Sequence, residues 1–330
     1  MASSRTESSW PRTSPPILTG FDMSTGAPLL IPRTKPILVR HLLTHSAGAG
    51  YTLFSPQLVQ WSKAVGRPLP IPSAAGAAGG GDSVDERFGY PFLFEPGAGW
   101  VYGSGIDWAG RLVEVITGQS LDEYVHAHVL VPVGVPRGGI AFFPAQHRAN
   151  PQTGEEAYQL AGVAVRDKET GKLGPFPSQF EAQRAAYGGQ GLHGGLGEYV
   201  KVLYSLTVDD GRILEPETAG LLFKSLLREP EAKQAMNEAL KGLSWIVGWI
   251  PLEGAEYDWS AVGLLSEKRG EEAGHRPEGF LQWGGALNLS WFVDRSKRVC
   301  GAFGTQVIPP GDPFVRPFMK EFEELVYSKL

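Results

Sequence analysis

One tyrosine stands in a glycine-rich stretch directly before a helical pattern. Residues 99–125 read GWVYGSGIDWAGRLVEVITGQSLDEYV, with Tyr102 between Gly99 and Gly103. A phenol held at the mouth of a site can pass a proton to or from a reacting group. The plainer interpretation is that Tyr102 packs a turn, since tyrosines near helix starts are common. Its position alone leaves both interpretations open.

A second stretch places two adjacent glycines inside a strand pattern. It reads FLQWGGALNLSWFVDRSKRVCGAFGTQ, in which Trp283 precedes Gly284, Gly285 and Ala286. Glycine weakens a strand and often marks the close approach of a ligand or of another backbone, whereas a β-bulge needs only one glycine. Trp283 would supply a flat apolar wall. The backbone N–H of Ala286 could donate to a developing oxyanion.

The histidines do not form a convincing metal site. His126 and His128 are two residues apart, which points them to different faces of a helix. His41 and His45 are four apart, but they lack the intervening glutamate of the zinc-protease H-E-x-x-H pattern. We interpret one of this pair as capping or packing and the other as exposed. The sequence predicts neither a metal nor another cofactor.

Other motifs of known chemistry are also missing from the sequence. The glycine-rich runs GAAGGGD and GGQGLHGG match neither the phosphate-binding G-x-x-x-x-G-K-[ST] pattern nor the dinucleotide fingerprint. Ser46 and Ser104 both lie outside a G-x-S-x-G nucleophile elbow. We therefore interpret the glycine-rich runs as loops.

The composition excludes several classes of function. The chain has 330 residues, 42% of them hydrophobic, and a net charge of −5, so no basic surface for nucleic acid is expected. No apolar run reaches the roughly 18 residues that a membrane span requires. Cys300 is the single cysteine, which fits a cytoplasmic protein. Residues 1–16 carry no apolar signal segment and are predicted to be disordered.

Helical patterns dominate the first two thirds of the chain. A short helix is predicted within 34–48, and a longer one begins near Asp107 and ends at Gly118, a residue type that favours helix C-termini. Ser120 and Glu123 form a capping-box pattern that starts another helix. The remaining patterns are interpreted as loops over 66–99 and 151–178 and as helices from Leu196 and over 216–228.

After residue 243 the pattern changes to short runs rich in aromatic and β-branched residues, typical of antiparallel strands. These runs are SWIVGWI, FLQW, ALNLSWFV and RVCGAFGTQ, and an amphipathic helix follows them. This order favours the α+β class, with an antiparallel sheet flanked by helices plus a helical lobe. The apolar face of the last helix is predicted to comprise Phe314, Phe318, Phe322 and Leu325 together with Val315, Met319 and Val326.

Four segments resemble, in the same order, motifs of the serine β-lactamase-related hydrolases and acyltransferases. This family includes class C β-lactamases, penicillin-binding proteins, family VIII esterases and fungal polyketide transesterases. The likeness runs from about Ile17 to the end and is strongest to the fungal branch, the lovastatin acyltransferase type. The segments are RHLLTHSAG at 40–48, FEPGAGWVYGSGIDWAG with the helices after it, GGQGLHGGLGEYVKVL, and QWGGALNLSWFVDRSKRVCGAFGTQVIPPGD, with WGGA at the place of the family's K-T-G motif.

The resemblance implies a β-lactamase/transpeptidase-like fold and assigns roles to named residues. Tyr102 would be the catalytic tyrosine, whose phenol or phenolate relays a proton between nucleophile and leaving group. Trp283, Gly284 and Gly285 would line the acyl site, and the N–H of Ala286 would be one oxyanion donor. The expected partner is a small-molecule acyl substrate.

The same resemblance predicts a part that these residues do not contain. The family nucleophile is the serine of an S-x-x-K motif before the RHLLTH segment, and no serine here has a lysine three positions on. We therefore expect a β-lactamase-related domain over 17–330 without the family's N-terminal portion. It would comprise a helical lobe over about 34–240, and strands and a helix over about 243–330. A sheet without its first strands would leave an edge uncovered and invite self-association.

Three functional hypotheses follow from this resemblance. The first is an acyltransferase or esterase that acts on ester or thioester acyl groups in secondary metabolism. The second is a non-hydrolytic relative that keeps the pocket and binds an acyl or polyketide-like ligand. The third is a fragment completed by a partner chain. The missing S-x-x-K motif argues against ordinary acyl transfer by this chain and separates the first hypothesis from the other two.

Overall fold

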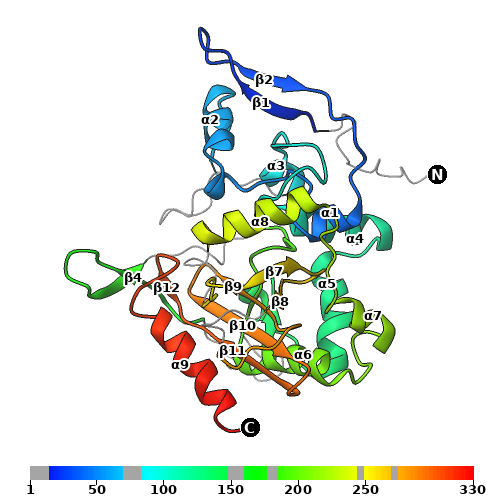
Figure 1. Cartoon of the computed structure of the whole chain (residues 1–330), viewed down its shortest axis with the longest axis vertical. Helices are drawn as coiled ribbons and strands as arrows, with labels where there is room; N and C mark the ends of the chain where they lie inside the picture. Colours follow the sequence, from blue (N-terminus) through cyan, green and yellow to red (C-terminus); the bar gives the residue numbers. More distant parts are fainter. Residues whose placement is uncertain (1–14, 70–82, 148–159, 177–183, 244–248, 269–273) are drawn as a thin grey trace.

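The computed structural model describes residues 15–69, 83–147, 160–176, 184–243, 249–268 and 274–330 (Figure 1). The disorder predicted for residues 1–16 therefore concerns a segment of which 1–14 lie outside the described residues. Within the described part, no helix is both long enough and apolar enough to cross a membrane.

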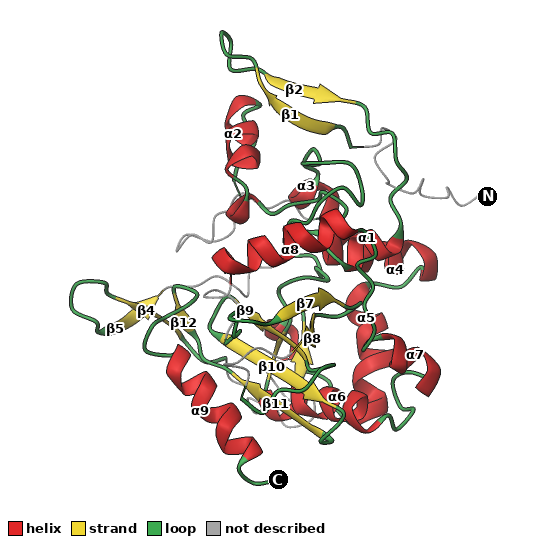
Figure 2. Cartoon of the chain, viewed as in Figure 1, coloured by secondary structure: helices red, strands yellow, loops and turns green. Residues whose placement is uncertain are grey.

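A five-stranded antiparallel sheet forms the centre of the lower half of the molecule (Figure 2). Its strands follow the order β11-β10-β9-β8-β7, so each strand pairs with its neighbour in the chain. FLQW, ALNLSWFV and RVCGAFGTQ supply β9, β10 and β11, as their aromatic and β-branched composition predicts. The predicted strand at 244–250 lies mostly outside the described residues. The strands are β7 Glu256–Trp259, β8 Leu264–Lys268, β9 Leu281–Gly285, β10 Leu289–Asp294 and β11 Val299–Phe303.

Two helices cover the two faces of this sheet. α6 (Leu196–Val208) packs Leu203 on an apolar face that includes Leu281 and Val293. α9 (Arg316–Tyr327) covers the other face, where the ring of Tyr327 stacks on Phe292 at 6.1 Å. The class predicted from the sequence, α+β with an antiparallel sheet flanked by helices, is confirmed.

The buried face of α9 only partly matches the predicted one. Val315 and Met319 of the predicted face are buried, but Glu323 is buried as well, and Phe318 is 58% exposed. Glu323 is buried because it forms a bidentate ion pair with the buried guanidinium of Arg276, at 2.6 Å to each oxygen. An ion pair rather than a continuous apolar stripe therefore sets the rotation of α9. The other exposed members of the predicted face are Phe314 and Leu325.

The remaining helices form the lobe that carries the predicted capping signals. α4 begins at Gly105, two residues before the predicted start at Asp107. It ends with Gly118 in the left-handed conformation and is followed by the Ser120–Glu123 capping box, both as predicted. The helix predicted over 216–228 is shorter, and α8 after it was not predicted. These elements are α1 Val39–Leu43, α2 Pro56–Ala64, α3 Val84–Phe88, α4 Gly105–Thr117, α5 Leu121–Val125, α7 Pro216–Leu221 and α8 Pro230–Leu243, with the short 3-10 helices η1 Thr52–Phe54, η3 Val131–Val133 and η4 Pro144–His147 and the π-helical segment η2 His126–Leu130.

Two regions that the sequence presents as loops contain regular secondary structure. The predicted loop over 151–178 contains the hairpin of β4 and β5, to which β12 adds in parallel. The predicted loop over 66–99 contains α3, whose Val84 and Phe88 are buried. The strands of the smaller sheets are β1 Ile17–Phe21, β2 Pro28–Ile31, β3 Ile140–Ala141, β4 Val163–Arg166, β5 Leu173–Phe176, β6 His193–Gly194 and β12 Val307–Ile308.

Candidate active site around Tyr102

The glycines around Tyr102 allow two backbone segments to touch. A Cβ on Gly103 would lie 2.0 Å from the carbonyl oxygen of Ala49, and one on Gly105 would lie 2.2 Å from that of Leu42. No side chain fits at such distances. The glycines therefore let the segment before α4 lie directly against the end of α1 and the turn after it.

Backbone hydrogen bonds hold these two segments in register. Val101 donates to the carbonyl of His45 at 3.1 Å, and Ser104 donates to that of Ala49 at 2.9 Å. The carbonyl of Tyr102 accepts from the N–H of Tyr51 at 3.4 Å. These three hydrogen bonds hold the backbone before, at and after Tyr102. Packing of a turn would not by itself require so many restraints.

The phenol of Tyr102 meets the indole of Trp283, which lies 181 positions away in the chain. The Trp283 Nε1–H donates to the Tyr102 hydroxyl oxygen at 3.1 Å, and the two ring centroids are 5.3 Å apart. Trp283 is buried in β9, while Tyr102 is half-buried. The structure therefore brings together the two residues that the sequence singled out separately.

Aromatic rings surround this pair. The ring of His45 is 4.6 Å from that of Tyr102, and the rings of Trp259 and Trp283 are also 4.6 Å apart in an edge-to-face arrangement. Trp259 is anchored in turn, because its Nε1–H donates to the carbonyl of Leu43 at 3.1 Å. We call Tyr102 and its surrounding rings the ring cluster; its members are His45, Tyr51, Phe54, Trp100, Tyr102, Trp259 and Trp283.

The surroundings of Tyr102 change the acidity of its phenol. Burial is the largest effect and raises the pKa of Tyr102 above the ordinary phenol value, because the phenolate loses solvation. The hydrogen bond from Trp283 acts in the opposite direction, and the carboxylate of Asp107 raises the pKa further. At neutral pH the phenol therefore carries its proton and can donate it.

The other predicted site residues follow Trp283 along β9. Gly284 and Gly285 pair with Ser290 and Leu289 of β10 without a register shift, so they do not form a β-bulge. Ala286 is exposed at the start of the hairpin turn between β9 and β10. The structure thus places these residues on one continuous stretch with Trp283, while only Trp283 makes a hydrogen bond to Tyr102.

A buried carboxylate links the Tyr102 segment to a second glycine-rich segment. Asp107, in the first turn of α4, accepts from the hydroxyl of Tyr51 at 2.5 Å and from the N–H of Gly189 at 3.0 Å. Burial raises the pKa of Asp107 to about 6, although both hydrogen bonds lower it. A Cβ on Gly188 would lie 2.3 Å from the carbonyl of Ile106. The run GGQG is therefore packed against the start of α4.

Both members of the His41–His45 pair are buried, at 4% and 5% exposure. The prediction that one of them is exposed is therefore wrong, while the prediction of capping and packing holds. His41 Nδ1 accepts from the N–H of Leu38 at the start of α1, and His45 packs in the ring cluster. Among the described residues, no three His, Cys, Asp or Glu side chains are grouped as metal ligands.

Sequence reasoning missed several members of the ring cluster. Trp100 carried a usable signal, because residues two apart in an extended segment share a side, and Trp100 precedes Tyr102 by two. Trp259 and Tyr51 carried none, since they reach the cluster from β7 and from the turn before η1. Asp107 was interpreted only as a helix start, and its burial became visible in three dimensions.

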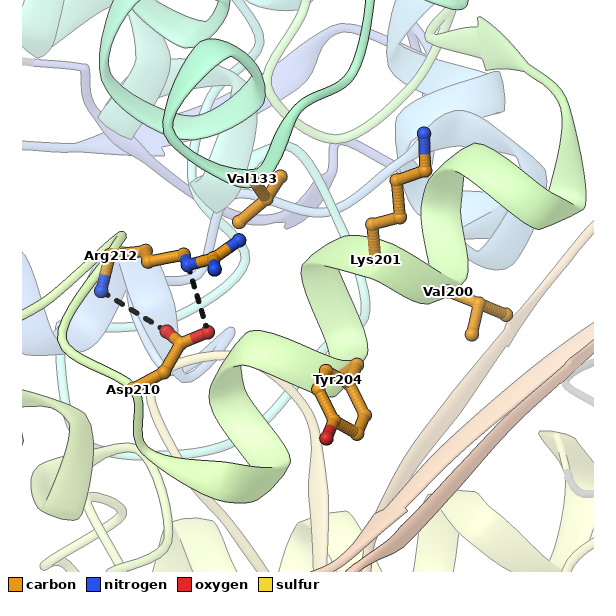
Figure 3. Close-up of a pocket in the computed structure, with 6 residues that line it drawn as sticks. All are labelled: Val133, Val200, Lys201, Tyr204, Asp210 and Arg212. Carbon is orange, nitrogen blue, oxygen red and sulfur yellow. Dashed lines mark hydrogen bonds and ion pairs between the residues drawn. The ribbon is translucent and has the colours of Figure 1, made fainter.

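A separate pocket of about 280 Å³ opens between η3, α6 and the turn after α6 (Figure 3). Its charged groups are already paired. Arg212 Nε lies 3.4 Å from Asp210, and Lys201 Nζ lies 2.7 Å from Glu198. No member of the ring cluster lines it, and the other lining residues are Val133, Val200 and Tyr204.

Residues 10–320 match the family model described as Beta-lactamase. The chain is 32% identical over 322 residues to lovastatin esterase from Penicillium rubens, covering 95% of this chain and 75% of that protein. It is 31% identical over 318 residues to monacolin J acid methylbutanoyltransferase from Aspergillus terreus, covering 95% and 72%. A simvastatin synthase mutant from Aspergillus terreus superposes with a TM-score of 0.79 at 30% identity, over 96% of this chain and 71% of that chain.

Proposed function

The chain belongs to the beta-lactamase family, and from this premise we propose that the ring cluster is an acyl-transfer site for ester or thioester groups of a small molecule. The single observation that carries the proposal is the Trp283 Nε1–H bond to the Tyr102 oxygen. It joins the glycine-rich tyrosine segment to the WGG strand, the two segments to which the sequence resemblance assigns catalytic and acyl-lining roles.

Tyr102 has the geometry of a proton relay. Its oxygen already accepts from Trp283, so its own hydrogen is available to a leaving-group oxygen or sulfur. After it donates that hydrogen, the phenolate can accept a proton from an attacking hydroxyl, and the Trp283 N–H then stabilises its charge. We assign this general acid and base role to Tyr102.

The stretch after Trp283 is the proposed acyl-binding wall. Gly284 and Gly285 present backbone without side chains, so a ligand can approach the strand closely. The N–H of Ala286 is the proposed oxyanion donor at the end of β9. The exposure of Ala286 supports this role, since a ligand must reach it from solvent.

The substrate class follows from the relatives. Their names describe a lovastatin esterase and a methylbutanoyltransferase that acts on monacolin J acid. We propose that this chain binds a compound of the same kind, with a short acyl chain in ester or thioester linkage on a polyketide-like core, in secondary metabolism. The aromatic side chains of the ring cluster suit the apolar part of such a ligand.

A nucleophile decides whether the site only binds an acyl compound or also transfers its acyl group. No serine in the 330 residues has lysine three positions on, so this stretch of chain does not contain the S-x-x-K pair. Loss of a catalytic serine lowers the rate by orders of magnitude. We therefore propose that these 330 residues bind acyl compounds but transfer acyl groups slowly unless another chain supplies the nucleophile.

Intact-protein mass spectrometry with p-nitrophenyl butyrate and a fluorophosphonate, together with equilibrium binding of the ester, tests the proposal. We expect saturable ester binding that is lost in Trp283→Ala and kept in Tyr204→Phe, an exposed tyrosine outside the ring cluster. A stoichiometric adduct on one serine would replace the slow-transfer part of the proposal with a new nucleophile. A folded chain without ester binding would overturn the acyl site altogether.

Self-association is the second part of the proposal. β2 pairs only with β1 among the described strands, and its Leu29, Leu30 and Ile31 are between 43% and 48% exposed. In Figure 1 this hairpin lies at the top of the molecule with β2 on the outside. An apolar outer strand of this kind supports pairing with a second chain.

The partly buried, unpaired Cys300 supports a cytoplasmic location.

A further inference from the structure

We propose that His45 is a positioning residue for Tyr102, which it orients through its imidazole ring and its Nδ1 atom. This inference rests on the proposed role of Tyr102, and it assigns a function to the second histidine of the RHLLTH segment. His45 contacts the Tyr102 segment by its backbone, by its ring and by a ring nitrogen, and each contact is separate evidence.

The backbone of His45 is in a conformation that is uncommon for residues other than glycine. Its φ is +57°, in the left-handed region just after the end of α1, where glycine is the usual residue. A side chain kept in this strained conformation points to a role for the side chain itself. In the same conformation the His45 carbonyl accepts from the N–H of Val101 at 3.1 Å.

The ring of His45 makes a second contact through a hydrogen bond to the peptide next to Tyr102. The N–H of Gly103 donates to His45 Nδ1 at 3.3 Å. Because Nδ1 is the acceptor, the proton of the neutral ring is on Nε2. The peptides on both sides of the Val101–Tyr102 unit are therefore bound to one residue.

The imidazole ring supplies the third contact, through its aromatic neighbours. Its centroid lies 4.6 Å from the Tyr102 ring and 5.1 Å from the Trp259 ring. Trp259 in turn lies against Trp283, whose N–H holds the Tyr102 oxygen. His45 thus contacts Tyr102 directly, and through Trp259 it also supports Trp283, the hydrogen-bond donor of Tyr102.

Burial keeps this imidazole neutral. It lowers the pKa of His45 to about 3, and the Gly103 hydrogen bond only partly offsets this effect. A protonated Nδ1 could not accept from Gly103, so the neutral form is the one that the geometry needs. The contact is therefore constant across the pH range in which a phenol and a hydroxyl exchange protons.

The indole N–H resonance of Trp283 in a ¹H–¹⁵N spectrum tests the inference without any substrate. Trp283→Phe assigns the resonance, and Tyr102→Phe gives its position without the hydrogen bond. In His45→Gly we expect the resonance to move toward that position. In His45→Asn, which tolerates a positive φ and offers a carbonyl oxygen in place of Nδ1, we expect it to move less than in His45→Gly, because only the ring contacts are lost. Trp61, in α2, is the internal reference.

The outcomes separate positioning from turn structure. Glycine suits φ +57° better than histidine, so a residue that serves only the turn would be replaced by glycine without moving Trp283. A folded His45→Gly chain with an unmoved Trp283 resonance would therefore overturn the inference. If that variant does not fold, the ring ¹⁵N shifts of the unsubstituted chain decide, since a protonated Nδ1 also overturns it. The Trp283 resonance is measured without substrate, so a failure of ester binding would overturn the proposed function without overturning this inference.

Discussion

At the scale of single residues, Gly103 shows how a missing side chain can fix the position of its neighbour Tyr102. Its Cα touches the opposing strand segment, where a Cβ would lie 2.0 Å from Ala49 O and 2.5 Å from Gly50 Cα. Both neighbours are backbone atoms, which cannot rotate away as a side chain could. Any substitution must separate the segment that carries Tyr102 from the turn after α1.

We expect Gly103→Ala to lower the free energy of unfolding by about 2–4 kcal/mol, because the added methyl group forces backbone apart. Urea unfolding followed by circular dichroism measures the change. Gly197→Ala is the matched control: Gly197 lies in α6, where an added methyl group would meet open space, so alanine should stabilise by about 0.5–1 kcal/mol. Equal effects of the two substitutions would contradict the close contact at Gly103.

Asp107 makes stability depend on pH. Its pKa is raised from 3.8 to about 6 in the folded chain, so the folded state binds the proton more tightly than the unfolded state. Its favourable contribution is complete below pH 3.8 and is lost as pH rises through about 6. Relative to Asp107→Asn, the unsubstituted chain should lose about 3 kcal/mol across this window, measured by urea unfolding at a series of pH values.

Tyr51→Phe provides the companion test for Asp107. The Tyr51 hydroxyl lowers the pKa of Asp107 by donating to the carboxylate, so its removal should raise that pKa. The pH range over which stability falls should then extend above pH 6. Stability curves of the unsubstituted chain and Asp107→Asn that run parallel from about pH 4 to 7 would show that Asp107 is not perturbed.

The residues of the candidate site were predictable only where they lie in a recognisable sequence motif. Tyr102 and Trp283 stood out by their glycine neighbours and by the family resemblance, and the structure joins them. His45 and Asp107 looked ordinary, because neither the spacing of histidines nor an aspartate near a helix start reports burial. Their places in the structure depend on hydrogen bonds with Gly103 and Gly189, which lie 58 and 82 positions away in the chain.

At the scale of elements, α9 shows that the hydrophobic pattern of a helix can differ from the set of residues that it buries. Part of its predicted apolar face is buried, but the Arg276–Glu323 ion pair brings a charged residue inward and leaves Phe318 exposed. The same guanidinium donates to Gln282 of β9 at 3.0 Å, so the polar contact ties the helix to the strand that carries Trp283.

We expect Met319→Ala to cost about 2–4 kcal/mol of stability and Phe318→Ala less than about 0.5 kcal/mol. The two residues are adjacent in α9, but Met319 is buried and Phe318 is exposed. Thermal and urea unfolding of both variants give the comparison. Equal costs of the two substitutions, or the reverse order, would contradict the burial of Met319 and the exposure of Phe318.

The elements found from sequence are those whose composition matches their environment. β9, β10 and β11 are aromatic and β-branched, and α4 ends at the glycine that the sequence marks as its stop. The β4–β5 hairpin escaped notice because its turn, DKETG, is polar and its anchor is distant. Arg166 at the end of β4 pairs with Asp312 at 2.5 Å, a contact across 146 positions that no local pattern contains.

At the scale of the whole molecule, the outer strand β2 sets an expectation for behaviour in solution. We expect the apparent mass in size-exclusion chromatography with light scattering to rise with protein concentration, and the double variant Leu30→Lys, Ile31→Lys to reduce this rise. Charge on an edge strand blocks strand pairing between chains. Ile116→Lys, at an exposed apolar residue of α4, is the control for added charge. A single mass at every concentration would rule out association through β2.

The crowding of three indoles at the site has an optical consequence. Trp259 lies 4.6 Å from Trp283 and 5.6 Å from Trp100, with the ring planes strongly inclined to one another. Chromophores this close couple their electronic transitions, so the assembled cluster should give a paired near-ultraviolet dichroic band that isolated tryptophans lack. Because each indole comes from a different segment, that band would report the correct assembly of the site in a single spectrum, before any ligand is added.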